Sequence, residues 1–427
     1  MDATPEPAPR RGPFAGLTRN VFVLGLVSLF TDISSEMIVP VRILFLVAVL
    51  NTPLTLAGLI EGIAESTASF VKIYSGSLAD RVPRRTPLII FGYGLSNLIK
   101  PLMAVVASWP AALGLIFLDR VGKGVRGSPR DALMADSTPA EYRGKAFGFH
   151  RAMDTLGAAI GPLLTVAILA LSNQDLRQVF AWTAVPGVLG ILVVLLFLRE
   201  KRRAVPATPR PATAAPSRTW AERWGELAAL GPRFWLFTAI ASLFAMGNSS
   251  DAFIFLRTEG IERQVMAVPL VYFGYNLVFA LLATPLGVLS DRWGRLPVLL
   301  TGYVAFGLVY AGWAAANQGW HVWVLFLFYG VYGAATDGVS KAQVTDVIDR
   351  KQRGTALGWY NGMTGFAALP ANVLGGWLWA IYGPGATFGF GAGVAFAAAG
   401  LLLVWTPWLR GKRSLSGAPQ VEPARAA

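Results

Sequence analysis

Two acidic residues, Asp32 and Glu36, lie within a long apolar stretch near the start of the chain. They are four residues apart, so a helix places both carboxylates on one face. Two carboxylates this close in a medium of low dielectric constant do not both ionise at low cost, so the pair is suited to bind and release a proton. A structural ion pair with Arg42 or Lys72 is the alternative role for either carboxylate.

The following apolar stretch carries Glu61, Glu65 and Lys72 at spacings of four and seven, which again predicts a single helical face. Glu61 is expected at the depth of Arg42, where the two form an ion pair. This row of charges is either a proton path or a latch between helices. Glu65 and, further along the chain, Asp154 are the next candidates to carry the proton.

Further polar residues interrupt the apolar stretches and predict the wall of a substrate cavity. An ionisable side chain in the middle of a membrane helix costs roughly 2.5–3.5 kcal/mol, so it is expected to face a cavity or a partner. The predicted members of this cavity are Arg42, Lys72, Lys100, Arg120, Lys123, Asp251, Arg257, Tyr275, Asn276, Asp337, Lys341 and Asn361.

The composition excludes several classes of protein. Of the 427 residues, 54% are hydrophobic and only 14% are charged, against roughly 25% charged in soluble domains. Without cysteine, and with only His150 and His321, the chain has no thiolate or multi-histidine metal site, so no metal or other cofactor is expected. The net charge of +13 is explained below by membrane topology rather than by nucleic acid. A nucleotide-binding loop of the type G-x-x-x-x-G-K-[ST] is also absent, which argues against an ATP-driven pump.

Stretches of about 20 mostly apolar residues predict membrane-spanning helices, and the sequence contains twelve of them. We therefore predict an all-α integral membrane protein. The predicted parts are an N-terminal tail (1–19), a six-helix bundle (20–198), a linker (199–233), a second six-helix bundle (234–409) and a C-terminal tail (410–427). Most arginines and lysines outside the spans fall on one side, which places both tails and the linker in the cytoplasm and the chain in the cytoplasmic membrane.

The two halves repeat each other. Ser34-Ser35-Glu36 followed by Arg42 matches Ser249-Ser250-Asp251 followed by Arg257, with the same internal spacing. The segments 76–81 and 287–292 match as well, and so do 143–148 and 353–358. Repeats of six spans that both begin in the cytoplasm are parallel repeats about an axis along the membrane normal, with a central cavity between them.

The segments 76–85 and 287–295 resemble the loop motif of the major facilitator superfamily, whose members show such repeats. The resemblance covers about residues 20–410. It implies that this motif biases the inward-open and outward-open states, a role that we assign above all to Asp80, Arg84, Asp291 and Arg295. The full set of motif positions is Gly76, Asp80, Arg81, Arg84, Gly287, Asp291, Arg292 and Arg295.

Two further segments carry the resemblance. Arg120-x-x-x-Gly124 is similar to the family motif that holds an arginine inside the membrane. Gly157, Gly161 and Pro162 resemble the motif associated with exporters and antiporters, although Leu164 and Thr165 stand where that motif has a glycine pair.

The resemblance implies a secondary transporter that works by alternating access. Our first interpretation is proton-coupled efflux of a small organic solute; uptake or efflux of an organic anion is the alternative. A non-transporting membrane sensor is an alternative of a different class. An enzyme is not expected, because no nucleophile–base pair or metal set is found in the sequence. The expected partners are a small-molecule substrate, protons and membrane lipid, with the chain acting as a monomer.

Overall fold

The fold was obtained as a computed structural model, which describes residues 16–139, 142–200, 230–348 and 352–409. Within these ranges the chain is helical and contains no strand. The helices of the first half are α1 (Arg19–Ile38), α2 (Arg42–Leu44), the π-helical turn η1 (Phe45–Val49), α3 (Leu54–Arg81), α4 (Thr86–Leu102), the short 3-10 helix η2 (Met103–Val105), α5 (Trp109–Ser137), α6 (Arg143–Leu171), α7 (Leu176–Trp182) and α8 (Ala184–Phe197). Those of the second half are α10 (Gly231–Gly247), α11 (Asp251–Glu262), α12 (Ala267–Trp293), α13 (Arg295–Ala315), α14 (Gly319–Asp346), α15 (Arg353–Tyr382) and α16 (Pro384–Leu409).

Ten helical segments of the described residues are long and apolar enough to cross a membrane. Some of them join two helices, such as α7 with α8 and α10 with α11. The two remaining predicted spans correspond to α5 and α15, which are long enough but contain no stretch of described residues as apolar as those of the ten. Six charged residues lie between Asp119 and Asp131 in α5, and α15 is rich in glycine and contains two asparagines.

Large apolar side chains cover much of the outer surface. Leu171, Leu196 and Val404, for example, are 88%, 65% and 70% exposed. So much exposed apolar surface is unfavourable in water and favourable in contact with lipid chains. The exposed residues therefore agree with the all-α integral membrane fold.

The same helix packing occurs twice. In the first half α1 packs on α6 and α8, while α4 packs on α5 and α8. In the second half α10 packs on α15 and α16, while α13 packs on α14 and α16. The bundles are thus structural repeats, as the repeated sequence segments predict.

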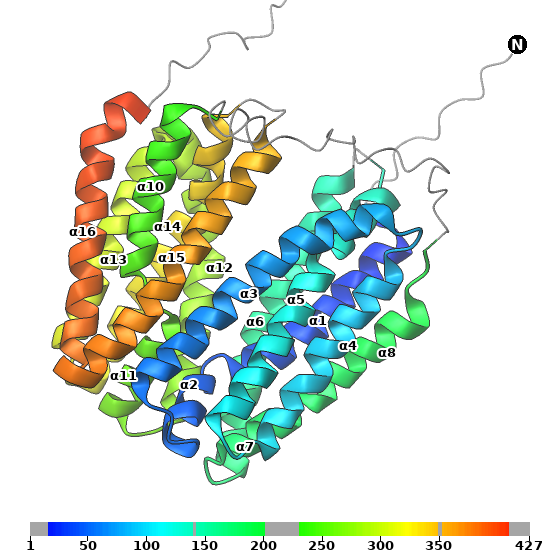
Figure 1. Cartoon of the computed structure of the whole chain (residues 1–427), viewed down its shortest axis with the longest axis horizontal. Coiled ribbons are helices and arrows are strands. Elements are labelled where there is room, and N and C mark those ends of the chain that lie inside the picture. The colour runs from blue at the N-terminus through cyan, green and yellow to red at the C-terminus, as the bar shows by residue number, and fades with distance from the viewer. Residues whose placement is uncertain (1–15, 140–141, 201–229, 349–351, 410–427) are drawn as a thin grey trace, which may run out of the picture.

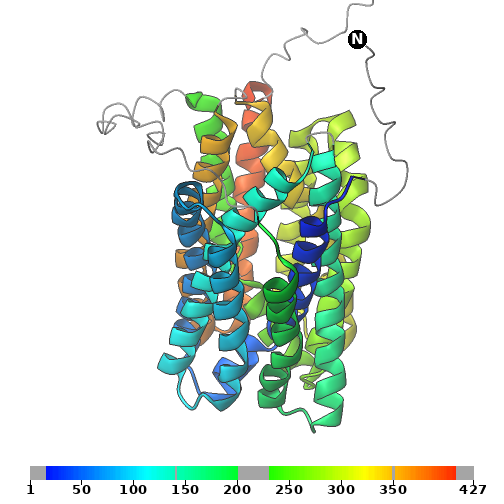
Figure 2. The ribbon, with the colours of Figure 1, turned by 90° about the vertical axis from the view of Figure 1, so that its right-hand side faces the viewer.

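The two bundles stand side by side, with α10–α16 to the left and α1–α8 to the right in Figure 1. The start of α1 and the end of α16 lie at the same end of the molecule, uppermost in Figures 1 and 2. We call this the terminal end and the opposite one the distal end. The bundles meet through α3 against α15 and α6 against α12, two pairings that the repeat relates to each other.

The α3–α15 contact is closest towards the distal end. A side chain added at Gly58 would collide with the backbone of Asn372, and one added at Gly62 would come within 2.9 Å of the Leu369 side chain. Small residues allow helices to approach this closely. Ser66 continues the row, since its hydroxyl donates to the Gly365 carbonyl at 3.3 Å. Beyond these residues, towards the terminal end, both helices line a cavity.

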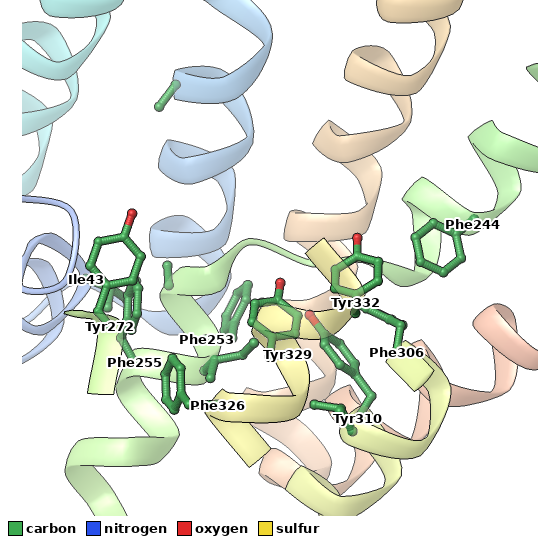
Figure 3. Packing of buried hydrophobic residues seen from close by; sticks show 14 of the residues in the cluster. Ile43, Phe244, Phe253, Phe255, Tyr272, Phe306, Tyr310, Phe326, Tyr329 and Tyr332 are labelled. Atoms are coloured by element: carbon green, nitrogen blue, oxygen red, sulfur yellow. The ribbon is translucent and has the colours of Figure 1, made fainter. Parts of the chain in front are cut away.

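Aromatic side chains fill the second bundle (Figure 3). Phe306 stacks on Tyr310 with 4.0 Å between ring centroids, and Phe244 stacks on Tyr303 at 3.9 Å. Tyr329 and Tyr332 belong to the same cluster and direct their hydroxyl groups away from it. These ring contacts hold the helices of the second bundle together.

One repeated element folds differently in the two halves. Around Ser34 and Ser35 the helix α1 is continuous, whereas Asn248, Ser249 and Ser250 separate α10 from α11. The free backbone groups at this break find partners elsewhere, because the Ser250 amide donates to Asn372 Oδ1 at 2.5 Å and Tyr310 donates to the Ser249 carbonyl at 3.1 Å. Such partners make a break in a membrane helix tolerable.

Candidate substrate cavity and its charged walls

A cavity of about 950 Å³ lies between the bundles, in the half of the molecule nearer the terminal end. Parts of α3, α5, α10, α14 and α15 line it. Its acidic residues are Glu65 and Asp251, and its amides include Asn248 and Asn361. We call it the acidic cavity.

A second cavity, of about 420 Å³, lies between α1, α3, α5, α6 and α12. Five basic residues line it together with three acidic ones, so we call it the basic cavity. The basic residues are Lys72, Lys123, Arg126, Arg130 and Arg151, and the acidic ones are Asp32, Glu36 and Asp154. Lys72 lines both cavities, which therefore adjoin at this side chain.

Asp32 and Glu36 lie on one face of α1 and both line the basic cavity, as their spacing predicts. Glu36 also reaches the other bundle, because the Tyr272 hydroxyl of α12 donates to Glu36 Oε2 at 2.8 Å. This hydrogen bond joins the predicted proton carrier to the partner bundle. Asn276, one turn further along α12, donates to the Ala158 carbonyl of α6 at 3.3 Å.

The exporter-like glycines position this carboxylate pair. A Cβ atom at Gly157 would lie 2.8 Å from Cβ of Asp32, and one at Gly161 would lie 2.7 Å from Cβ of Glu36. Helix α6 therefore packs directly on the two turns of α1 that carry the carboxylates. Pro162 is buried in the same contact region of α6.

Glu65 contacts neither Lys72 nor the α1 carboxylates through a hydrogen bond or ion pair in the described structure. Its partner is Asn372 of α15, whose Nδ2 donates to Glu65 Oε2 at 3.3 Å. Because Asn372 Oδ1 already accepts from the Ser250 amide, the amide group of Asn372 is oriented with its donor towards Glu65. Glu65 is exposed in the acidic cavity, whereas Asn372 is fully buried.

The other two cavity carboxylates have partners within their own bundles. Asp154 lies 3.4 Å from Nδ1 of His150, one turn earlier on α6. Asp251 accepts a hydrogen bond from the Tyr329 hydroxyl at 2.6 Å. Asp251 thus connects the acidic cavity to the aromatic core shown in Figure 3.

Several predicted cavity residues lie behind the wall of the first bundle. Arg42 forms the expected ion pair with Glu61, with 2.8 Å between Nε and Oε1. Lys100 is buried, and its ammonium donates to Asn97 Oδ1 at 3.1 Å and to the Thr31 carbonyl at 3.4 Å. Arg120 lies 3.6 Å from Asp119. These residues surround a small pocket of about 30 Å³, so they help to hold the bundle together.

Predicted cavity residues of the second bundle also divide into two groups. Asn361 and Lys341 line the acidic cavity, where Lys341 forms an ion pair with Asp337 at 2.7 Å. Arg257 instead donates to the Ala316 carbonyl, and Tyr275 stacks on Tyr272 with centroids 5.9 Å apart.

The loop motif forms equivalent ion pairs in both halves. Arg295 binds Asp346 at 3.2 Å and Asp291 at 2.5 Å. In the first half Arg85 binds Asp136 at 2.6 Å, whereas the adjacent Arg84 is exposed. The side chains of Asp80 and Arg81 lie outside the described structure. A Cβ atom added at Gly76 would lie 3.5 Å from Oγ of Ser128 on α5, whereas one added at Gly287 would meet no atom within 4 Å. Arg292 is exposed.

Sequence reasoning missed several residues that the structure brings to these sites. Tyr272 and Asn372 were not expected as partners of carboxylates, and Arg85 was not distinguished from Arg84. Three basic residues of the basic cavity were not predicted to line it, namely Arg126, Arg130 and Arg151. The four-residue spacing of Tyr272 and Asn276 is a signal that both face one neighbour. No group of three or more metal-ligating side chains occurs within the residues that the structure describes.

The chain matches the sequence model of a known family. The model of the Major Facilitator Superfamily matches residues 24–266 and 264–425. The uncharacterized MFS-type transporter MJ1317 of Methanocaldococcus jannaschii is 33% identical over 91% of this chain and 95% of its own length. The class G tetracycline resistance protein of Vibrio anguillarum is 25% identical over 65% of this chain and 72% of its own length.

Solved structures show the same fold at low identity. A mutant of the nucleoside transporter NupG has a TM-score of 0.75 at 14% identity, with 90% of this chain and 99% of that one covered. A bacterial homolog of the human lysosomal transporter Spinster, in an inward-facing and unoccupied conformation, has a TM-score of 0.67 at 18% identity over 91% and 95% of the two chains.

Proposed function

The chain belongs to the Major Facilitator Superfamily and is thus a multi-pass membrane transporter of small molecules rather than an enzyme, and we propose that it exports an organic solute in exchange for protons. The proposed transporter works as a monomer embedded in lipid, because both bundles that border the cavities belong to one chain.

The observation that carries the proposal is the position of Glu36. It lies beside Asp32 in the basic cavity and accepts a hydrogen bond from Tyr272 of the other bundle. A carboxylate accepts this hydrogen bond better than a protonated carboxyl group does, because the charge strengthens it. Binding of a proton to the pair therefore weakens one link between the bundles, which couples proton binding to their relative movement.

Orientation and direction rest on separate observations. The excess of basic residues at the terminal end supports a cytoplasmic position for that end, towards which the acidic cavity lies. Ion pairs of the loop motif, such as that of Arg295 with Asp346, lie at this end and are assigned to the balance of states. Outward transport is supported by the glycines that pack on Asp32 and Glu36 and by relatives named as tetracycline resistance proteins.

Transport of an organic anion is the second candidate. Lys123 and Arg151 are exposed in the basic cavity, and neither forms an ion pair with another described residue. Such cations are free to bind a negatively charged group of a solute. This candidate differs from the first in the charge of the solute and in having no need for the α1 carboxylates.

The test uses purified protein in proteoliposomes that contain the pH indicator pyranine. A pH gradient is imposed, and cationic, anionic and zwitterionic organic solutes are added one at a time. Exchange predicts that the wild-type protein moves protons only when a transported solute is present, and that Asp32→Asn and Glu36→Gln abolish this movement. Wild-type proton movement in both variants would contradict the proposal, and Glu65 and Asp154 would be tested next.

A matched control is available at the distal end. Asp175 caps α7 by accepting from the Arg177 amide at 2.8 Å, and it lines neither cavity. Asparagine is an equally good capping residue, so Asp175→Asn removes a carboxylate without loss of the cap. This variant is expected to couple protons like the wild type. If the wild type transports only the anionic solutes, and does so without moving protons, the second candidate is favoured.

A further inference from the structure

The adjoining cavities have opposite electrostatic character once internally paired charges are set aside. In the acidic cavity, Lys341 is paired with Asp337, whereas neither Glu65 nor Asp251 has an ion pair among the described residues. Their partners are the neutral side chains of Asn372 and Tyr329. Among the described residues, Lys72, at the border with the other cavity, is the one lining cation without an ion pair, so two carboxylates face this cavity against a single unpaired lysine.

The basic cavity shows the reverse. Arg126 lies over the Tyr93 ring at 4.3 Å, and Arg130 is paired with Asp131 at 2.9 Å. Of the acidic residues, Asp154 contacts His150, whereas Glu36, like Glu65 and Asp251, has only a neutral partner, Tyr272. The groups without an ion pair in the described structure are the acidic Asp32 and Glu36 and the basic Lys72, Lys123, Arg126 and Arg151. Four unpaired basic residues against two unpaired carboxylates leave an excess of positive charge at this cavity, and all of these basic residues except Arg126 are exposed.

The two cavities meet at Lys72, and apolar rings lie along both. Phe70 and Phe366 line the acidic cavity and are 45% and 59% exposed, and Phe279 lines the basic one. Charges held in a membrane protein without an internal partner are unfavourable unless water or a ligand compensates them. One molecule that spans both cavities would compensate charges of both signs and cover the rings between them.

We propose that the transported solute is zwitterionic: its basic amine binds at Glu65 and Asp251, its acidic group binds at Lys123, Arg151 and Lys72, and its apolar body lies against the phenylalanines. This inference rests on the proposed function only in taking the two cavities as the substrate site. A zwitterion is compatible with both candidate functions, because it presents an anionic group to the basic cavity without being an anion overall.

The test measures equilibrium binding to the full-length protein in lipid nanodiscs, with no pH gradient. Two trios of probes keep the body constant and change only the charge. They are phenylalanine, its methyl ester and its N-acetyl derivative, and ciprofloxacin, its methyl ester and its N-acetyl derivative. In each trio the parent is a zwitterion, the ester keeps only the amine, and the N-acetyl form keeps only the acid. We expect at least one zwitterion to bind roughly 10- to 100-fold more tightly than both of its singly charged forms.

Two variants then test which residues bind the amine of the solute and which bind its acidic group. Glu65→Gln is expected to weaken the zwitterion and the ester by about tenfold and to leave the N-acetyl form unchanged. Lys123→Gln is expected to weaken the zwitterion and the N-acetyl form and to leave the ester unchanged. Thermal unfolding shows whether each variant folds. If Glu65→Gln does not fold, Asp251→Asn replaces it, and if Lys123→Gln does not fold, Arg151→Gln replaces it.

The inference is overturned if no zwitterion in either trio binds more tightly than its singly charged forms, including the case in which none of the six probes binds. Equal binding of the N-acetyl form and the zwitterion would point to an organic anion instead. Because no gradient is present, a failure of proton coupling leaves the binding result intact. Conversely, proton-coupled movement of a singly charged solute without a preference for zwitterions would overturn this inference and leave the proposed function standing.

Discussion

The hydroxyl of Tyr272 donates a hydrogen bond to Glu36 across the interface of the two bundles, at 2.8 Å, although 236 residues separate them in the chain. Glu36 stands on α1 of the first bundle and Tyr272 on α12 of the second. The contact exists in the conformation whose cavities lie towards the terminal end. It therefore stabilises this state relative to one in which α1 and α12 separate.

Tyr272→Phe is expected to shift the equilibrium away from the present state. A hydrogen bond to a charged group contributes about 1.5–3 kcal/mol, so the population ratio of the two states should change about tenfold or more. The chain has no cysteine, so Asn361→Cys introduces a single thiol into the acidic cavity. The measurement is the rate at which a membrane-impermeant maleimide labels this thiol from the side of the terminal end, which should fall in the Tyr272→Phe background.

Tyr310→Phe is the matched control, because Tyr310 donates to the Ser249 carbonyl within the second bundle. It is expected to lower stability without changing the labelling rate. An unchanged rate in Tyr272→Phe would mean that the inter-bundle hydrogen bond does not set the balance of states.

Gly161→Ala is expected to destabilise the first bundle and to impair proton coupling. The new Cβ would lie 2.7 Å from Cβ of Glu36 and 3.0 Å from the Ile33 carbonyl oxygen, so α6 must move away from α1. Overpacking of this kind typically costs about 1–3 kcal/mol. Thermal unfolding in detergent and pyranine-detected proton movement are the two measurements.

Gly148 lies on the same helix, and a Cβ there would meet nothing within 4 Å. Gly148→Ala is therefore expected to be neutral or to stabilise α6 by up to about 1 kcal/mol, because alanine is the better helix former. Similar effects of the two substitutions would show that the close approach at Gly161 is unimportant.

Single substitutions of the Arg42–Glu61 pair are expected to cost more than the double substitution. Glu61 is fully buried and Arg42 is only 12% exposed, so removal of one partner leaves a buried, unpaired charge at a cost of about 3–5 kcal/mol. Arg42→Met and Glu61→Gln should each lower the unfolding temperature markedly, while the double variant should recover much of the loss. Additive losses would argue against a direct ion pair and in favour of separate packing roles.

The loop motif of the first half is expected to depend on Arg85 rather than on Arg84. The Arg85 guanidinium is nearly buried and binds Asp136 at 2.6 Å, the equivalent of the Arg295–Asp346 pair. Because Asp136 is half-exposed, Arg85→Gln should lower the free energy of unfolding by only about 1 kcal/mol. Turnover in proteoliposomes should fall with it, since this pair ties the start of α4 to the end of α5.

Arg84→Gln is the control, and its effect on stability should stay within about 0.5 kcal/mol, as is usual for an exposed residue. A larger loss of turnover in Arg84→Gln than in Arg85→Gln would restore the role that the family motif suggests for Arg84.

The sequence by itself determined the features that depend on local pattern. Long apolar stretches predicted the helices and the membrane, and matching segments predicted two bundles that pack alike. Spacings of four correctly placed Asp32 with Glu36 on one face, and paired Asp337 with Lys341. The sequence also predicted the Arg42–Glu61 ion pair, because neighbouring spans bring residues of similar depth together.

Only the tertiary structure decided which distant side chains meet. The repeated segments around Glu36 and Asp251 have the same spacing, yet α1 is continuous there whereas a break separates α10 from α11, and Asn372 and Tyr310 bind the free backbone groups at that break. Lys100 and Arg120 were expected to line the cavity like Lys123, but they lie behind its wall with their own partners. Hydrophobic periodicity specifies which face of a helix is buried, whereas the partner of a buried polar group depends on how two bundles pack, which no local pattern encodes.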